Sequence, residues 1–355
     1  MGSISSLPPE VKDVTERYGF CIVDDRFDSE DAEYLIDKPY ITTLQTKKAL
    51  GSETWKRLDS ELLTKRPDIW LRVYGDVNNL GFLENLNNLV RLSVNCLYEP
   101  IQNIQCISAL QNLSELVVED ESITSFQFLN SLEKKLTSLS LSKTKSKKPT
   151  LEFLSRFTNL EALSIHGHTK EIDVIASLKN LKHLSLSGLT LSNLDFVAPL
   201  RELDSFGIDL IKCKNYDALH DVNIKELSVS EIRGLESLSF ISDIKGIQNL
   251  DLSYLNKVTV LPSLASHKTI TRLMISYMSS LEDINSLFTC KLLRDFHFSN
   301  SNTPLDVEDF KPLLLLKHLK YVTIGTGRAG KNSKIVKLLN ESGLLPYEYY
   351  DFECT

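Results

Sequence analysis

Apolar residues recur along this chain in one fixed pattern: apolar, two variable residues, apolar, one variable residue, apolar. Eleven copies run from Leu89/Leu92/Val94 to Leu319/Val322/Ile324, and a degenerate twelfth copy lies at Leu71/Val73. Successive copies start 21 to 26 residues apart. The last three positions of each copy alternate in polarity, which predicts a short strand with side chains on opposite faces.

Each copy predicts one coil of a repeating structure. In the copy that ends at Leu184 and Leu186, these two leucines point inward, while Ser185 between them points outward onto a surface shared by all the coils. One coil leaves both of its flat faces exposed to water. Its stability must therefore come from stacking on neighbouring coils.

A period of 21 to 26 residues is that of leucine-rich repeats. Residues 180–200 resemble the repeat of internalin-type bacterial leucine-rich-repeat proteins, and the resemblance covers about 260 of the 355 residues. It implies an α/β solenoid, a leucine-rich-repeat horseshoe of about twelve repeats with a parallel concave β-sheet and helical N- and C-terminal caps. It names no partner, because this superfamily binds many unrelated ones.

One column departs from the family pattern. The family usually has Asn three residues after the last strand leucine, where it forms a buried hydrogen-bond ladder. Half of the residues in this column are apolar here, as at Leu189, Leu255 and Met278. We expect irregular turns, in which the backbone groups that Asn would satisfy find other partners.

The repeats divide the chain into three parts. We predict a helical N-terminal cap in residues 1–66, the solenoid in residues 67–327, and a C-terminal cap with an aromatic tail in residues 328–355. Caps are expected because the open ends of a solenoid expose apolar side chains.

The caps contain recognisable helix signals. Residues 52–65 place Trp55, Leu58 and Leu62 on one helical stripe, and an earlier helix is expected at residues 29–37. At the other end, Ser333 is placed to cap a further helix.

Composition narrows the possible partners. A net charge of −7 and a pI near 5.6 argue against nucleic acid. The six cysteines show neither metal-ligand spacing nor a paired framework. Neither end carries an apolar stretch that resembles a membrane span or a secretory signal. We therefore expect a reduced, monomeric protein of the bacterial cytoplasm with no cofactor and no metal.

Two motifs suggest other chemistry. Residues 325–332 nearly match a phosphate-binding loop, but Asn332 stands where Ser or Thr would hold magnesium, so a plain cap loop is favoured. Residues 1–6 fit the myristoylation consensus without a polybasic patch beside it. We expect no membrane contact unless Gly2 is myristoylated.

Two further signals are weaker. Residues 7–11 and 55–58 resemble the first and last segments of the F-box motif, although the gap between them is too long. His166, His168 and His183 lie in adjacent repeats, but three or four converging ligands are needed for a metal site. We interpret these histidines as structural or interface residues.

The outward columns of the predicted sheet are small hydroxyls in the central repeats. Larger residues, which usually anchor protein interfaces, gather in the C-terminal third. Tyr254 and Tyr277 occupy equivalent positions, so their rings should stand about 5 Å apart. The predicted partner contacts are Asp251, Tyr254, Arg272, Met274, Tyr277, Asp295, His297 and Tyr321.

These features favour a non-enzymatic module, an intracellular bacterial leucine-rich-repeat protein that binds a protein partner through its concave sheet. No activated nucleophile stands beside a base, and the repeat geometry forces no close pair of carboxylates. Two alternatives stay open: a secreted or injected effector that binds host protein, and an F-box-like ubiquitin-ligase adaptor.

Overall fold

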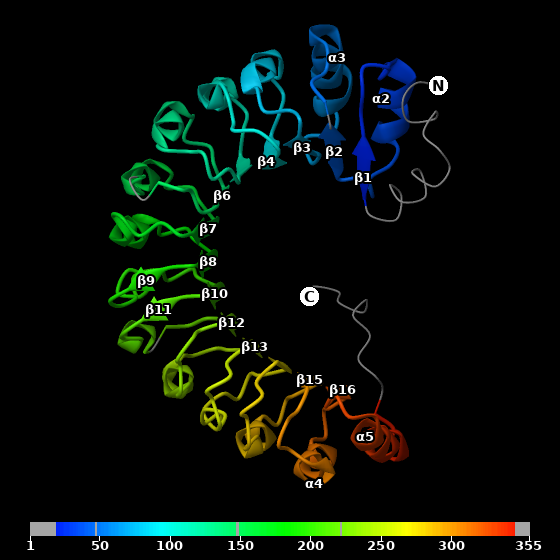
Figure 1. Ribbon diagram of the computed structural model, residues 1–355, viewed down its shortest axis with the longest axis vertical. Coiled ribbons are helices and arrows are strands. Elements are labelled where there is room, and N and C mark those ends of the chain that lie inside the picture. Colours follow the sequence, from blue (N-terminus) through cyan, green and yellow to red (C-terminus); the bar gives the residue numbers. More distant parts are fainter. Residues whose placement is uncertain (1–18, 47, 147–148, 221, 345–355) are drawn as a thin grey trace. The chain divides into compact units, whose positions relative to one another are not determined.

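The computed structural model describes residues 19–46, 48–146, 149–220 and 222–344 (Figure 1). The chain forms two compact units, Met1–Leu181 and Lys182–Thr355, which we call the N-terminal unit and the C-terminal unit. The Gly2 motif, the F-box-like segment at residues 7–11 and the aromatic tail lie outside the described residues.

In the N-terminal unit, seven strands pair in parallel and in chain order. They are β1 (Phe20–Ile22), β2 (Thr43–Thr46), β3 (Trp70–Gly75), β4 (Arg91–Leu97), β5 (Glu115–Val118), β6 (Ser138–Leu141) and β7 (Ala162–His166). The register aligns equivalent repeat positions, so that Leu116 pairs with Leu139. Apolar residues of successive repeats therefore stack directly.

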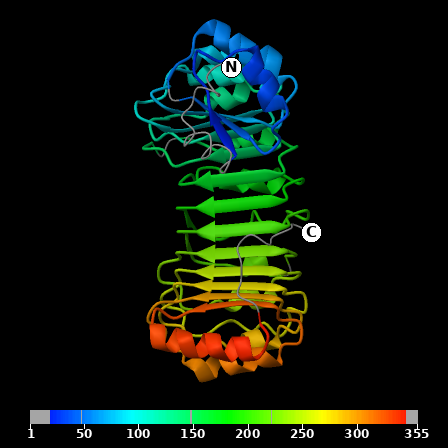
Figure 2. The same ribbon diagram turned by 90° about the vertical axis from the view of Figure 1, so that its right-hand side faces the viewer.

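The C-terminal unit contains the same ladder, which Figure 2 shows as parallel arrows coloured green to orange. Its strands are β8 (His183–Ser187), β10 (Ser205–Asp209), β12 (Glu226–Ser230), β13 (Asn249–Ser253), β14 (Arg272–Ser276), β15 (Asp295–Ser299) and β16 (Tyr321–Gly325). A second, two-stranded sheet joins β9 (Thr190–Leu191) to β11 (Lys212–Cys213). The predicted parallel strands are confirmed.

Most returns between strands contain a short 3₁₀ helix of three to six residues. Its three residues per turn place residues i and i+3, such as Leu80 and Leu83, on the same buried side. These helices span Leu80–Asn85, Ile104–Ala109, Gln127–Ser131, Glu152–Arg156, Ile172–Ser177, Asp217–Leu219, Ser239–Asp243, Asn285–Thr289 and Lys311–Leu315.

The column that the family fills with Asn finds other hydrogen-bond partners here, as the sequence predicts. The carbonyl of Leu189 accepts from the Lys212 amide at 2.8 Å, which forms part of the two-stranded sheet. The carbonyl of Met278 accepts from the Asn300 side-chain amide at 2.6 Å. Different neighbours thus satisfy the same backbone group in different repeats.

The start of the described chain contains the two predicted helices. They are α2 (Ser29–Ile36), which begins with a capping box at Asp28, and α3 (Ser52–Arg57), which continues into π-helical turns at Leu58–Leu63. The strands β1 and β2 were not predicted from the sequence. They are three and four residues long and lie outside the repeat pattern.

The C-terminal helix begins earlier than predicted. After the short helix α4 (Val307–Phe310) and strand β16, α5 spans Ala329–Glu341. The Ser333 hydroxyl donates to the Ala329 carbonyl at 3.0 Å, one turn back within the same helix. The prediction that Ser333 caps this helix is therefore wrong, because Ser333 lies inside it.

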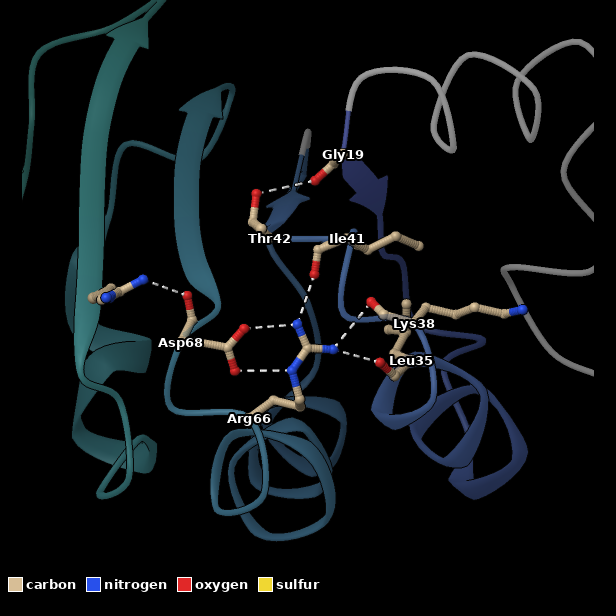
Figure 3. Close-up of polar contacts among 8 residues, drawn as sticks. Gly19, Leu35, Lys38, Ile41, Thr42, Arg66 and Asp68 are labelled. Atoms are coloured by element: carbon tan, nitrogen blue, oxygen red, sulfur yellow. Dashed lines mark hydrogen bonds and ion pairs between the residues drawn. The ribbon is translucent and has the colours of Figure 1, made fainter. Parts of the chain in front are cut away.

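A buried arginine connects the first helix to the first repeat (Figure 3). The Arg66 guanidinium donates to the carbonyls of Leu35 at 2.7 Å and Ile41 at 2.9 Å, and it forms an ion pair with Asp68 at 2.7 Å. Leu35 lies in the last turn of α2, where a positive charge complements the helix dipole. Arg91 of β4 in turn donates to the Asp68 carbonyl at 2.8 Å.

We predict that Arg66→Met destabilises the N-terminal unit by roughly 2–5 kcal/mol, because the two buried carbonyls of Leu35 and Ile41 then lose their donors. Urea unfolding followed by circular dichroism measures the change. Lys56→Met, at an exposed ion pair with Glu53, is the control and should leave the midpoint nearly unchanged. Equal midpoints for the two variants would show that Arg66 is dispensable.

Two histidines are buried, one in each unit. His168 Nε2 donates to the Ser142 carbonyl, and His267 Nε2 donates to the Ile241 carbonyl, both at 3.0 Å. Burial lowers the pKa of both rings below their ordinary value, although each carbonyl contact raises it in part. Both rings are therefore neutral donors in the folded protein.

These lowered pKa values make stability depend on pH. Below about pH 6.5 the unfolded chain binds protons that the folded histidines do not, so stability falls as the pH drops from 7 towards 5. Thermal midpoints over this range should fall less steeply for His168→Gln/His267→Gln than for the wild type. The exposed His220→Gln should follow the wild type, and identical slopes for all three proteins would contradict the prediction.

Candidate functional site

Part of the outward face of the C-terminal unit is lined by small side chains in register. One column consists of Ser230, Ser253, Ser276 and Ser299, each paired with the next. In the middle column, Gly207 pairs with Ser185 on one side and Ser228 on the other. The predicted floor of hydroxyls is confirmed, and it is lowest at Gly207, which has no side chain.

A hollow of about 230 Å³ opens on this face. Strands β10, β12, β13 and β14 line it, and Gly207 and Ser228 contribute to its floor. Its polar and charged lining residues are Ser205, Ser228, Glu226, Asn249, Asp251 and Arg272. The hollow is the candidate functional site of the C-terminal unit.

Charge is unevenly distributed around the hollow. Asp251 is half-buried, and burial raises the pKa of its carboxyl, while the positive charge of Arg272 lowers it in part. Glu226 is exposed and accepts from the Asn249 side-chain amide at 3.1 Å. Two carboxylates therefore face the hollow with one guanidinium.

The structure divides the eight predicted contacts into three groups. Asp251, Arg272 and Met274 line the hollow. Tyr254 and Tyr277 follow β13 and β14 directly. Asp295, His297 and Tyr321 lie on β15 and β16, outside the lining of the hollow.

The two tyrosines stack on one another. Their ring centroids are 4.5 Å apart and their planes differ by 12°, which confirms the predicted spacing of about 5 Å. Tyr254 is 45% exposed and Tyr277 is 47% exposed, so the pair forms an aromatic ridge beside the sheet face. Asp295, in contrast, is buried and accepts from the Arg294 guanidinium at 3.0 Å.

The ridge belongs to a row of residues in the left-handed conformation. In five successive repeats of this unit, the residue directly after the strand has positive φ: Gly188, Leu210, Glu231, Tyr254 and Tyr277. Each of their amides donates to the last strand carbonyl of the next repeat, at distances of 2.8 to 3.2 Å. The left-handed turn thus extends the hydrogen-bonded ladder by one residue.

Glycine adopts this conformation without strain, but larger residues do not. For Leu210, Glu231 and the two tyrosines the cost is about 1 kcal/mol each. Backbone strain of this kind is often retained at functional sites. The strained positions also include exposed apolar and aromatic side chains, which is typical of a binding surface.

The site includes residues that the sequence prediction missed. Gly207, Glu226, Ser228 and Asn249 line the hollow but were not among the eight predicted contacts. The sequence does mark the hollow, because Gly207 is a glycine in a column that otherwise carries serines and larger residues. The eight predicted contacts were chosen as large or charged side chains, whereas the space at this position comes from the lack of one.

In the segment 325–332, which nearly matches a phosphate-binding loop, Asn332 and Lys331 form hydrogen bonds with other residues of the protein. The Asn332 side-chain oxygen accepts from the Thr326 amide at 2.9 Å and from its hydroxyl at 2.6 Å. Lys331 Nζ donates to the Leu305 carbonyl at 2.5 Å and lies 3.8 Å from Asp306. Lys331 and Asn332, which occupy the positions important for phosphate binding, instead connect this segment to its surroundings. This arrangement agrees with a structural cap loop.

The other weak signals also correspond to structural roles. Trp55 is buried and stacks on Phe82 with centroids 4.1 Å apart, and Leu58 is buried as well. His168 packs edge-on against Phe126 at 4.9 Å. Among the described residues, no cluster of three or more His, Cys, Asp or Glu side chains is placed to hold a metal ion. No helix in this part of the chain is both long and apolar enough to cross a membrane.

Stacked coils of strand, turn and short helical return define a leucine-rich-repeat solenoid. No protein-family model matches the sequence, and no curated protein matches it either. Among solved structures, an internalin of Listeria monocytogenes is similar, with 17% identity, a TM-score of 0.52, and coverage of 92% of this chain and 95% of that one.

A leucine-rich-repeat protein of Leptospira interrogans also matches, with 18% identity, a TM-score of 0.46, and coverage of 88% of this chain and 91% of that one. The internalin structure supports the leucine-rich-repeat fold of this chain. At 17% identity, the likeness concerns the fold and not the function.

We predict that Glu231→Gly raises the free energy of unfolding by about 1 kcal/mol, because glycine relieves the left-handed strain. The Glu231 side chain is exposed, so little buried contact is lost. Glu236, also an exposed glutamate but with ordinary φ, supplies the control, and Glu236→Gly should not stabilise. Chemical denaturation measures both changes, and a loss of stability in Glu231→Gly would refute the strain.

Proposed function

We propose that this protein is a non-enzymatic interaction module that binds a protein partner through the outward sheet face of its C-terminal unit. The observation that carries the proposal is the hollow over Gly207, which opens among three of the predicted contacts. The aromatic ridge of Tyr254 and Tyr277 follows two of the same strands.

The size of the hollow favours a protein over a small molecule. Sites for small ligands usually enclose about 300–1,000 Å³ and bury most of the ligand. The hollow measures about 230 Å³. A partner that spreads over the serine floor, fills the hollow and packs on the tyrosines would use the whole face. Tyr and Arg residues commonly dominate the binding energy of such interfaces.

Two of the buried cysteines, Cys21 and Cys290, do not resemble catalytic thiols. Burial raises the pKa of Cys21 to about 12 and that of Cys290 to about 11. Reactive thiols have lowered values, because the thiolate is the nucleophile. These two cysteines therefore support packing roles and agree with a module that does no chemistry.

The alternatives are supported less well. In an F-box-like adaptor, residues 55–58 would face another protein, but Trp55 and Leu58 are buried in the N-terminal unit. The cytoplasmic location, the monomeric state and the effector alternative stay predictions from the sequence.

Filling the hollow tests the proposal. A Cβ at Gly207 would meet its nearest neighbour, the Ser185 hydroxyl, at 3.8 Å, which is an ordinary contact, and Gly207→Leu adds bulk to the lining of the hollow. Ser164→Leu adds the same side chain to the middle column of the N-terminal unit and is the matched control. We predict that proteins captured from an extract of its own cells are retained by Ser164→Leu and reduced at least tenfold by Gly207→Leu.

Quantitative mass spectrometry of the captured proteins gives the readout, with circular dichroism to confirm that both variants fold. If Gly207→Leu retains its partner as well as the wild type does, the sheet face of the C-terminal unit is not the binding surface. If both variants lose it, the effect is not specific to the hollow.

A further inference from the structure

The hollow over Gly207 has room for a single long side chain. Its volume of about 230 Å³ lies below the range of small-molecule pockets. Its position is also specific, because the middle column is open at Gly207 and carries side chains at Ser185, Ser228 and Asp251 on the neighbouring strands. A partner residue that points at the sheet can enter at this position.

The walls of the hollow are acidic on balance. Glu226 on β12 and Asp251 on β13 face it, and Arg272 on β14 is the one positive charge in its lining. The positive charge of Arg272 interacts with the partly buried carboxylate of Asp251. The charge of Arg272 is therefore already partly balanced within the protein. A third carboxylate, Asp209, lies two residues beyond Gly207 on β10 and accepts from the Ser187 hydroxyl at 3.0 Å.

An incoming anion and an incoming cation would meet different surroundings. A carboxylate could pair with Arg272 but would also approach Glu226 and Asp251, and like charges brought together cost several kcal/mol. A lysine or arginine would face two carboxylates, and the Met274 side chain would contact its aliphatic stem. Charge complementarity therefore favours the cation.

We propose that the partner protein inserts one lysine or arginine side chain into the hollow over Gly207, between Glu226 and Asp251. This inference rests on the proposed function, which it extends by naming the residue that the partner contributes. Tyr254 lies three residues beyond Asp251, about 10 Å along the chain direction. The aromatic ridge therefore contacts a different residue of the same partner.

A library of random peptides displayed on phage, selected on the full-length protein, provides a direct probe. We expect the selected peptides to share a lysine or arginine at one position. Binding of a selected peptide should weaken at least tenfold with Glu226→Gln and with Asp251→Asn. Arg272→Gln should not weaken it, because this change removes a repulsive charge. All three substitutions are close in shape to the native residue and lie on the outward face, so the fold should be retained.

A double-mutant cycle assigns the contact. Replacing the shared peptide cation by glutamine and Asp251 by asparagine should cost less together than the sum of the separate losses, because both remove the same interaction. The inference is overturned if the shared residue is acidic and its binding depends on Arg272. It is also overturned if Glu226→Gln and Asp251→Asn leave binding unchanged.

Gly207→Leu separates this inference from the proposed function. If peptides lose binding to Gly207→Leu but tolerate the carboxylate substitutions, the surface is correct and the cation is wrong. If the selected peptides bind Gly207→Leu as tightly as the wild type, the proposed surface itself is wrong, and the inference fails with it.

Discussion

Every coil of this protein can bury its apolar side chains only against the coils beside it. The inward positions of paired strands meet in register, as Leu227 meets Leu250 and Leu250 meets Leu273. Burying each such side chain contributes about 1.5–3 kcal/mol relative to exposure. The strand register, the short returns and the need to cover terminal coils all follow from this stacking.

Stacking constrains one face of each strand and leaves the other free to vary. In β13, Leu250 and Leu252 are buried, while the residues between and beside them are partly exposed. The outward face can therefore combine serines, a glycine, charges and tyrosines without disturbing the core. The hollow and the aromatic ridge both belong to this unconstrained face. The cost of the ridge is local backbone strain, which the ladder hydrogen bonds of Tyr254 and Tyr277 hold in place.

Much of this fold follows from the sequence, because the inward leucines repeat with a period set by the coil. The repeat strands from β3 to β16 and the spacing of the Tyr254 and Tyr277 rings could be predicted for that reason, whereas the short strands β9 and β11 were not. The strands β1 and β2 could not, since they join the sheet by backbone hydrogen bonds and carry no repeat signature. The role of Arg66 was also hidden, because its partners are main-chain carbonyls up to 31 residues away.

The candidate site was predicted less completely than the fold. Large side chains could be recognised on the outward face, and Asp251, Arg272 and Met274 do line the hollow. The hollow itself arises where Gly207 interrupts a column, which matters only once the register with Ser185 and Ser228 is known. The row of residues with positive φ likewise could not be predicted from the sequence, since Leu and Tyr rarely adopt positive φ.

Photo-crosslinking tests most directly whether the outward face of the C-terminal unit contacts the partner. A photo-reactive amino acid in place of Ser253, on the outward face beside the hollow but outside its lining, is compared with one in place of Ser142, which follows β6 in the N-terminal unit. Binding through the C-terminal unit predicts a covalent adduct with the partner from position 253 and none from position 142. An adduct from position 142 alone would contradict it.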